Sequence, residues 1–371
     1  MSKPEIQGFI ETARRFVKLE VSPMVGTEGR DGNLSKLPQI VESAASIGLT
    51  ASADPQSPGY ECGIWGKACL TESPAASVAI LEEVAAACAG VAACLHFSSL
   101  AALELDGMPN PPRDAAVAFF EDSFPLTAET ISKPAKDAVK IASENGQLLL
   151  SGTKVLVPSS PNCPGYLVYA SDRSGWRRVL VAANARGLSI EDSGYRTGLA
   201  ALKIASLKFD RVAVDAKFAL PAKDPSAFLR RLFLGLAAIA AGNARGAVEA
   251  AAAYAAERYQ GLSKIANHPA VKIMLGDAAS RVSAGHAHLT AVCEEDRDDF
   301  DSLIRAAAAK LRICVDCWQA VTDSLQVLGG YGYMEDYRME KRLRDAMTLK
   351  VMCGKPDELK MFCSTKLTGG V

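Results

Sequence analysis

The stretch "QVLGGYGYMEDYRMEKRLRDA" (residues 326–346) decides how the rest of the chain is interpreted. It joins an apolar helical run to a charged helical run through three glycines and three tyrosines. Glycines at such a place end a helix, because the left-handed backbone that closes the last turn suits a residue without a Cβ. A helix cap does not require a glutamine, however. We therefore treat Gln326, Gly329 and Gly330 both as a helix cap and as a candidate ligand-binding loop.

Residues 223–371 predict a four-helix bundle. Apolar residues recur with a helical period in three long runs, 228–259, 269–295 and 299–330, and a fourth follows over 338–352. Acidic residues open the third run and glycines close it, as the helix dipole and the capping rules favour. Long helices joined by short connections make such a bundle.

Two further segments precede the bundle. Residues 1–118 predict a helical domain, since "EIQGFIETARRFVKLEV" (5–21) and "LPQIVESAASIGL" (37–49) carry apolar residues with a helical period. Residues 119–222 change to strand alternation around a turn at Asn145–Gly146. No helix separates these strands, so they predict a β-barrel-like domain. The expected fold class is α+β, in the order helical domain, β domain, helical bundle.

The composition is that of an ordinary globular protein, with 49% hydrophobic and 22% charged residues. Lysine and arginine number 41 against 42 acidic residues, so the net charge of -1 favours neither nucleic acid nor an anionic membrane surface as a partner. No run of about 18 apolar residues lacks charge, and we predict no transmembrane helix. The ten cysteines form no small-domain disulfide framework and no apolar leader opens the chain, which predicts reduced thiols in the cytoplasm.

The sequence also predicts no metal site. Cys314 and Cys317 form a single pair within a helical run, where buried thiols are common. His286 and His288 lie two residues apart on a helix and so point in different directions.

The stretch 326–346, together with the order of the segments, resembles the acyl-CoA dehydrogenase family. "YAAERYQGLSKIANHPAVKIMLGDA" (254–278) and "GLAALKIASLKFDRVAV" (198–214) resemble further segments of that family, so the resemblance covers most of the chain. The family's Q-x-x-G-G-x-G-Y and D-Y-P-V-E-R-x-x-R-D-A are matched without a gap by Gln326, Gly329, Gly330, Gly332, Tyr333, Asp336, Tyr337, Glu340, Arg344, Asp345 and Ala346.

The resemblance implies FAD as cofactor and an acyl-CoA thioester as substrate. In this family a glutamate removes the α-proton and FAD accepts hydride from the β-carbon, which forms a 2-enoyl-CoA. A weakly acidic C–H needs a base placed within reach, and a hydrogen-bonded carbonyl oxygen, in a dry pocket. The family holds FAD across a subunit interface, so the resemblance also implies a dimer or tetramer, with electron-transfer flavoprotein as a candidate acceptor of the electrons.

The positions that would carry this chemistry depart from the family. The usual base lies in a Y-E-G-T-S run after R-D-A, where this chain has "VMCGKPDE" (351–358) and Cys353 takes the place of the glutamate. A thiol is a base or nucleophile only where its surroundings favour the thiolate, and it is otherwise inert packing. A one-residue slip would instead bring Asp357 and Glu358 into play. The family's other base position falls near Leu232, which has no carboxylate beside it.

The positions that would hold the chain's own flavin are also changed. The family's T-E-P-x-A-G-S-D resembles "TAETISKP" (127–134), in which only Thr127 is retained. The family's G-x-K-x-W-I-T-N becomes "GTKVLVPS" (152–159), where Leu156 and Pro158 replace the tryptophan and the threonine. Proline has neither a backbone N–H nor a hydroxyl with which to donate to a flavin.

The positions that a subunit lends to its neighbour's flavin are better retained. Gly261 replaces a phenylalanine and Pro269 a glutamine, but the other positions match: Arg258, Gln260, Gln326, Gly329 and Gly330. Residues that serve a partner's flavin would be kept even if the chain held no flavin of its own.

Four hypotheses remain at this point. The first is a flavin-poor subunit that assembles with a complete, FAD-bearing homologue into a heteromeric acyl-CoA dehydrogenase. The second is a non-redox acyl-CoA enzyme (hydratase, lyase or hydrolase) on the same fold. The third is a non-catalytic scaffold or binding protein, and the fourth is a diverged homo-oligomeric flavoprotein.

Overall fold

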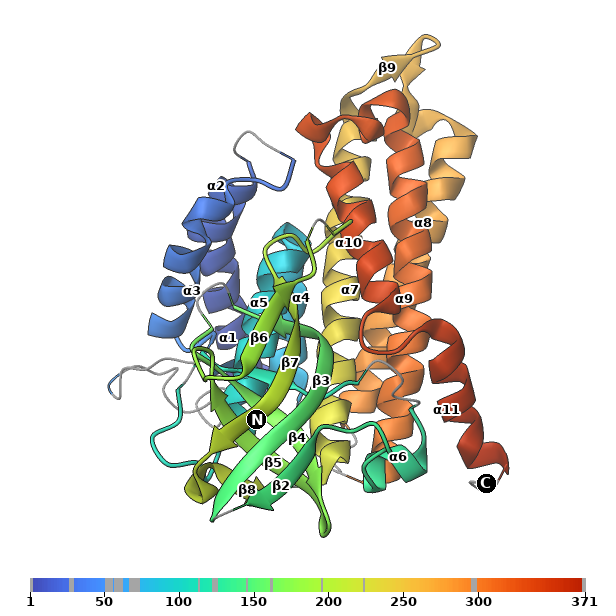
Figure 1. The fold of residues 1–371 in the computed structure, drawn as a ribbon. Coiled ribbons are helices and arrows are strands. Elements are labelled where there is room, and N and C mark those ends of the chain that lie inside the picture. The colour runs from blue at the N-terminus through green and yellow to red at the C-terminus, as the bar shows by residue number, and fades with distance from the viewer. Residues whose placement is uncertain are drawn as a thin grey trace.

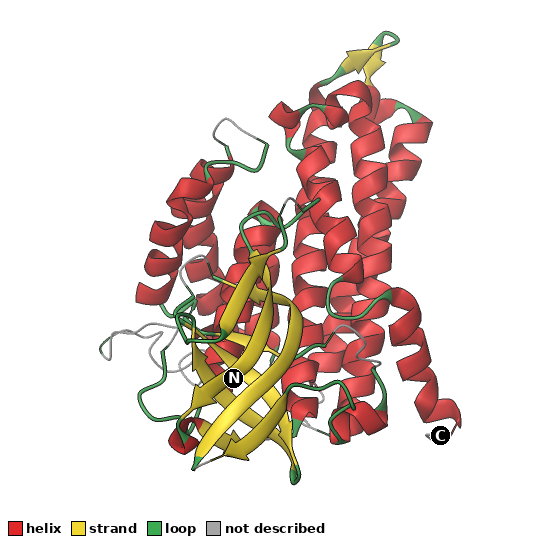
Figure 2. Cartoon of the chain, in the orientation of Figure 1, coloured by secondary structure: helices red, strands yellow, loops and turns green. Residues whose placement is uncertain are grey.

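The structure is a computed structural model. The residues it describes are 3–26, 30–50, 56, 63–66, 74–112, 114–121, 126–144, 146–160, 163–194, 196–222, 224–294 and 299–368. An N-terminal group of helices, a central sheet and a long helical bundle follow one another along the chain (Figure 1). The helices lie on two sides of the molecule and the strands are gathered between and below them (Figure 2).

The N-terminal segment is helical, as predicted. The helices α4 and α5 are separated only by Cys88, whose backbone is extended (φ -152°, ψ 107°). Almost every residue of α5 is buried, which explains why its sequence is apolar all round. The helices are α1 (Lys3–Phe16), α2 (Ser22–Val25), α3 (Leu37–Ser46), α4 (Ala75–Ala87) and α5 (Ala89–Glu104), with a π-helical turn at Val17–Val21.

The central segment forms one mixed sheet of eight strands. Their order is β6-β7-β3-β2-β4-β5-β8, and β1 runs parallel to β4. The strands are β1 (Ala116–Ala118), β2 (Lys140–Glu144), β3 (Gln147–Ser159), β4 (Gly165–Asp172), β5 (Gly175–Ala182), β6 (Leu188–Asp192), β7 (Lys203–Val214) and β8 (Ala219–Pro221), with a short helix α6 (Ala128–Ser132) between β1 and β2.

The predicted hairpin is formed by β2 and β3. Glu144 pairs directly with Gln147, so the turn has two residues. Gly146 has a φ of +81°, which suits a residue without a Cβ, and Asn145 lies outside the described residues. β1 falls inside the segment 1–118 that we expected to be helical, because its pairing with β4 is made across about 50 residues and leaves no local pattern.

The C-terminal segment contains the four predicted helices and one more. Asp224 and Asp299 cap the first and third, each accepting a backbone N–H with its carboxylate. The fifth helix, α11, was not predicted. The helices are α7 (Pro225–Glu257), α8 (Pro269–Glu294), α9 (Phe300–Leu328), α10 (Met339–Val351) and α11 (Pro356–Thr368), and the hairpin of β9 (Tyr259–Gln260) and β10 (Ser263–Lys264) joins α7 to α8.

Helix α7 is the centre of the molecule and contacts α4, α5, α8, α9 and α10. Two of its glycines allow α4 to pack closely against it: a Cβ on Gly242 would lie 2.3 Å from the carbonyl oxygen of Glu82, and one on Gly246 would lie 2.2 Å from that of Ala86. By length and composition α7 is apolar enough to cross a membrane, but 89% of its most apolar window is buried inside the protein, as expected for a core helix.

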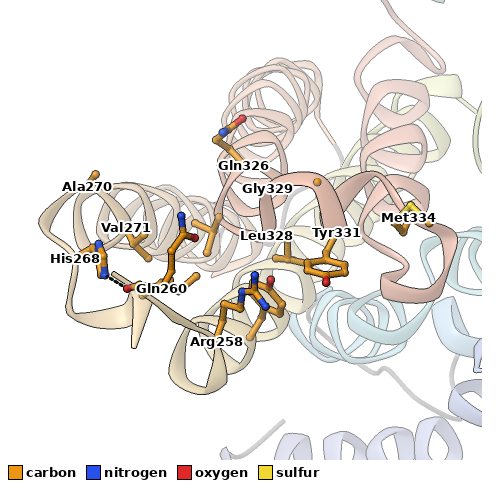
Figure 3. A pocket seen from close by; sticks show the side chains of 14 residues that line it. Arg258, Gln260, His268, Ala270, Val271, Gln326, Leu328, Gly329, Tyr331 and Met334 are labelled. Atoms are coloured by element: carbon orange, nitrogen blue, oxygen red, sulfur yellow. Dashed lines mark hydrogen bonds between the residues drawn. The ribbon is translucent and has the colours of Figure 1, made fainter. Parts of the chain in front are cut away.

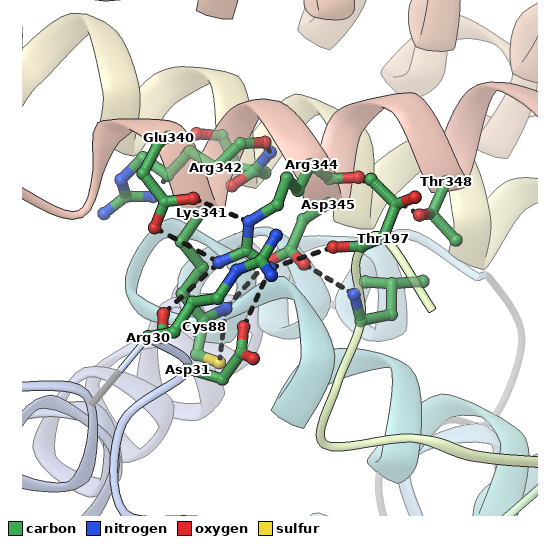
Figure 4. A network of polar contacts seen from close by, with 12 residues as sticks. Arg30, Asp31, Cys88, Thr197, Glu340, Lys341, Arg342, Arg344, Asp345 and Thr348 are labelled. Atoms are coloured by element: carbon green, nitrogen blue, oxygen red, sulfur yellow. Dashed lines mark hydrogen bonds and ion pairs between the residues drawn. The ribbon is translucent and has the colours of Figure 1, made fainter. Parts of the chain in front are cut away.

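A buried polar network ties α10 to the other two segments (Figure 4). The guanidinium of Arg344 donates to Asp31 Oδ1 and to the Thr197 carbonyl oxygen, both at 2.9 Å. Asp345 Oδ1 accepts the backbone N–H of Leu199 at 2.6 Å, and its Oδ2 accepts Lys341 Nζ at 2.7 Å. The R-D-A sequence therefore connects the bundle to the N-terminal helices and to the loop before β7.

Candidate functional site

A cavity of about 600 Å³ lies at the end of the bundle where α7 and α9 end and α8 begins (Figure 3). All five residues assigned above to a partner's flavin line this cavity: Arg258, Gln260, Gln326, Gly329 and Gly330. They come from two segments about 70 residues apart, so only the packing of α7 against α9 brings them together.

Local backbone geometry exposes these residues at the helix ends. Arg258 is the C-cap of α7 and leaves the helix with extended backbone (φ -70°, ψ 125°). Gly329 ends α9 with φ +58° and ψ -134°, a conformation that only glycine adopts readily. The chain then continues in 3-10 turns that return toward α10, which leaves Gly329 and Gly330 exposed at the cavity.

Arg258 lies on an aromatic platform. Its guanidinium is 5.5 Å from the centre of the Tyr331 ring, a cation–π distance. Tyr331 packs in turn against Tyr337 and Tyr254, with ring centres 5.1 Å and 6.2 Å away. No carboxylate of the described chain pairs with Arg258, so its charge is free to attract an anion.

The cavity has binding groups but no acid–base pair. It offers a guanidinium, the amides of Gln260 and Gln326, and glycine backbone at the end of a helix. His268 is occupied within the hairpin, where its Nε2 lies 3.1 Å from both the Gln260 carbonyl oxygen and Ser263 Oγ. Such a set suits an anionic, partly planar group such as a nucleotide diphosphate, and it lacks a base for proton removal.

Cys353 lies elsewhere, just beyond the far end of α10. Burial raises the pKa of its thiol to about 12, although the charge of Lys310 lowers it in part. Lys310 Nζ donates to the carbonyl oxygen of Gly354 at 2.6 Å and so anchors the loop rather than the thiol. The thiol is therefore protonated near neutral pH, and it is neither a base nor a reactive nucleophile.

The alternative base position is apolar. Leu232 is buried in α7 together with Phe233. One turn later a Cβ on Gly235 would lie 2.1 Å from the ring of His96, so this histidine packs directly on the helix backbone. Burial lowers the pKa of His96 to about 3, and its Nδ1 accepts the Trp65 indole N–H at 2.9 Å. His96 is thus a neutral core residue.

The residues at the positions of the chain's own flavin are engaged in local structure. The Thr127 hydroxyl accepts the Thr130 N–H at 3.1 Å, and the Thr127 N–H is bound by Thr130 Oγ1 at 3.0 Å, which is a capping box for α6. Leu156 lies at a bulge with φ +51° and is 63% exposed. Pro158 is buried in register with Ile204 and offers no donor.

The retained lysine of this region has a structural partner that the sequence did not suggest. Lys154 is fully buried, donates to the Phe119 carbonyl oxygen at 2.6 Å and forms an ion pair with Glu121. Burial lowers the pKa of Lys154 to about 8, although Glu121 raises it. Glu121 lies 33 residues away, in a segment without periodic pattern, so no sequence feature marked the pair.

Comparison with known proteins finds similarity to acyl-CoA dehydrogenases. The sequence model described as "Acyl-CoA dehydrogenase, C-terminal domain" matches residues 229–362. An acyl-CoA dehydrogenase of Bacillus subtilis (strain 168) is 28% identical over 238 residues, 61% of this chain and 62% of that protein, so the match spans less than two thirds of its length. A cyclohexane-1-carbonyl-CoA dehydrogenase of Syntrophus aciditrophicus (strain SB) is 23% identical over 94% of this chain and 93% of its own.

The fold is that of a solved relative. The three-dimensional structure of butyryl-CoA dehydrogenase from Megasphaera elsdenii superposes with a TM-score of 0.80 at 19% identity, over 99% of each chain. The expected α+β fold, with helical N- and C-terminal regions around a central sheet, is thereby confirmed.

Proposed function

The chain belongs to the acyl-CoA dehydrogenase family, and we propose that it is the flavin-poor subunit of a heteromeric acyl-CoA dehydrogenase. The observation that carries the proposal is an asymmetry between two half-sites. The partner-directed residues converge on one cavity that fits an anionic cofactor, whereas the chain's own flavin positions offer few donors and its base position holds a protonated thiol.

The partner-directed cavity fits part of FAD by its chemistry. Arg258 provides an unneutralised positive charge for phosphate oxygens, and its guanidinium packs against the Tyr331 ring. The amide of Gln326 and the backbone at Gly329 add hydrogen-bonding groups elsewhere on the cavity wall. FAD bound mainly by a complete partner subunit would supply the hydride acceptor for converting an acyl-CoA thioester to a 2-enoyl-CoA. This chain would bind and orient the nucleotide end of that FAD.

The chain's own half-site does not fit FAD in the same way. Pro158 has no backbone N–H to donate. The hydroxyl and the N–H of Thr127 are already hydrogen-bonded to Thr130 at the start of α6. Leu156 stands where the family has an aromatic ring. No base stands at position 353 or 232. We therefore assign the proton removal to the partner, with electron-transfer flavoprotein as the candidate acceptor of its electrons.

The proposal is tested by the visible spectrum of the purified protein. We expect the chain expressed alone to be colourless, and its complex with the family member encoded nearest to it to carry flavin at fewer than one FAD per chain. A chain that binds FAD stoichiometrically by itself would contradict the proposal and favour the diverged homo-oligomer.

Single substitutions then test the cavity. Arg258→Ala and Gln326→Ala should weaken flavin retention by the complex, the former about 10- to 100-fold, because a hydrogen bond to a charged group is lost. Arg312→Ala is the matched control, since Arg312 is an exposed arginine on α9 whose partner is Asp316. Equal flavin retention in all three variants would argue against the cavity as a cofactor site.

The location of the protein is proposed to be the cytoplasm. The eight cysteines within the described residues are all free thiols, several of them buried. Reduced cysteines support a reducing compartment. Cys62 and Cys69 lie outside the described residues.

A further inference from the structure

The β9–β10 hairpin projects beyond the end of the bundle as a short arm (Figures 1 and 2). Gln260 pairs with Ser263, so Gly261 and Leu262 alone make the turn. Their φ angles are +59° and +68°, which is the mirror-image turn that two-residue hairpins favour. Leu262 stands at the tip and its relative exposure is 104%, the highest among the exposed apolar residues.

Leucine is an unfavourable residue for this turn. Positive φ at both central positions favours glycine, asparagine or aspartate. A leucine in this conformation has a strained backbone, because its Cβ clashes with neighbouring backbone atoms. The Leu262 side chain packs in none of the hydrophobic clusters of the described residues, so the isolated fold gains nothing that offsets the strain. Strain of this kind, retained without an internal benefit, points to a function outside the chain.

The arm is held in a defined position. Ile265 N–H donates to the Arg258 carbonyl oxygen at 2.9 Å and closes the base of the hairpin. His268 Nε2 lies 3.1 Å from the carbonyl oxygen of Gln260 and 3.1 Å from Ser263 Oγ, so it connects both strands. A preorganised arm loses little conformational entropy when it binds.

Apolar exposure continues from the arm onto the rim of the cofactor cavity. Tyr259 in the arm is 65% exposed and Ile273 on α8 is 72% exposed. Met334, which lines the cavity itself, is 49% exposed. Because Gln260 belongs to both the arm and the cavity, a partner that completes the cavity also reaches the arm.

We propose that the β9–β10 hairpin is a docking arm whose Leu262 side chain enters an apolar recess of the flavin-bearing homologous subunit. The proposal rests on the half-site proposed above, because that half-site fixes which surface the partner covers. In this chain the apolar side chain stands one position after the phenylalanine of the family pattern, with Gly261 in the place of that phenylalanine. The arm therefore presents its apolar group at the tip, where it contributes to the choice of partner.

The experiment measures the affinity between the purified chain and the family member encoded nearest to it. Leu262→Gly and Leu262→Asn both suit a positive φ, so they remove the apolar side chain without adding strain. We expect each to weaken the complex about 10- to 100-fold, the effect of losing one buried leucine, while the melting temperature of the isolated chain stays the same or rises. Leu367→Ala is the control, since Leu367 is 88% exposed on α11.

Each result decides one of the two proposals. Unchanged affinity of Leu262→Gly would overturn the docking arm, and if Arg258→Ala still lost flavin the cofactor half-site would stand. Conversely, weaker assembly of Leu262→Gly with full flavin retention by Arg258→Ala would support the arm and overturn the half-site. Self-association of the isolated chain that Leu262→Gly abolishes would show that the occupant is a second copy, which overturns the proposed partner.

Discussion

The Lys341–Asp345 ion pair offers a sharp test of how α10 is locked to the rest of the molecule. The two side chains are 5% and 1% exposed, with 2.7 Å between Nζ and Oδ2. Burial alone would lower the pKa of the Lys341 ammonium, but Asp345 raises it above its ordinary value. Asp345→Asn keeps the size of the side chain and one oxygen for the Leu199 N–H, and it leaves a buried ammonium without its counter-charge.

Breaking a buried pair from one side costs about 3–5 kcal/mol, because the remaining charge is desolvated and uncompensated. Unfolding entropy of about 2.1 cal/mol/K per residue corresponds to about 0.8 kcal/mol per kelvin for 371 residues. We therefore expect Asp345→Asn to lower the melting temperature by about 4–6 °C. Tryptophan fluorescence and circular dichroism during heating measure the shift.

A matched pair controls for geometry. Lys366 and Asp301 are also 2.7 Å apart, but their side chains are 44% and 57% exposed. Asp301→Asn should change the melting temperature by less than about 1 °C, since exposed pairs contribute little. The double variant Lys341→Met/Asp345→Asn should recover part of the loss, because it removes the unpaired charge. If Asp345→Asn shifted the melting temperature no more than Asp301→Asn, burial would not govern the energy of this pair.

Three further predictions concern single residues. The hydrogen bond and charge of Glu82 raise the pKa of His286, so the stabilisation from this pair is present below about pH 6.5 and is lost as the pH rises through the raised value. Because the His286 side chain is 61% exposed, Glu82→Gln should lower the free energy of unfolding by less than about 1 kcal/mol at pH 5.5 and leave it unchanged at pH 9, as urea denaturation at the two pH values would measure. Tyr331→Leu should weaken flavin retention by the complex about 2- to 5-fold by removing the ring beside Arg258, whereas Tyr331→Phe should not. Cys353→Ser should leave enoyl-CoA formation by the complex within about twofold, and iodoacetamide should label the native thiol far more slowly than a free cysteine, because its pKa is about 12.

The helices and the β2–β3 hairpin were predictable because their determinants are local. Asp224, Asp299 and Gly329 mark helix ends within a few residues of the positions that they cap. Contacts between residues that are distant in the sequence have no such local signal. Glu82 on α4 is buried and bonds to His286, 204 residues away, at 2.9 Å. The sequence could not indicate this contact, because a helical period does not reveal which helix a given face will pack against.

The candidate site was predictable to a similar extent and for a similar reason. The resemblance singled out Arg258 and Gln326, and the structure brings them to one cavity. It gave no indication of Tyr331 as the ring beside Arg258, because the family pattern leaves that position open. Nor did it indicate Leu262, whose exposure and backbone conformation appear only once the turn is built.

The stretch 326–346 serves two separate purposes in this molecule. Its first half ends α9 at Gly329 and forms one wall of the cavity. Its second half, through Arg344 and Asp345, ties α10 to the N-terminal helices and to the loop before β7. Neither half contains the family's usual base position, which is occupied by Cys353 in this chain. Under the proposed function, a chain that folds and completes a partner's cavity needs the whole stretch even without a base of its own, because neither purpose depends on that base.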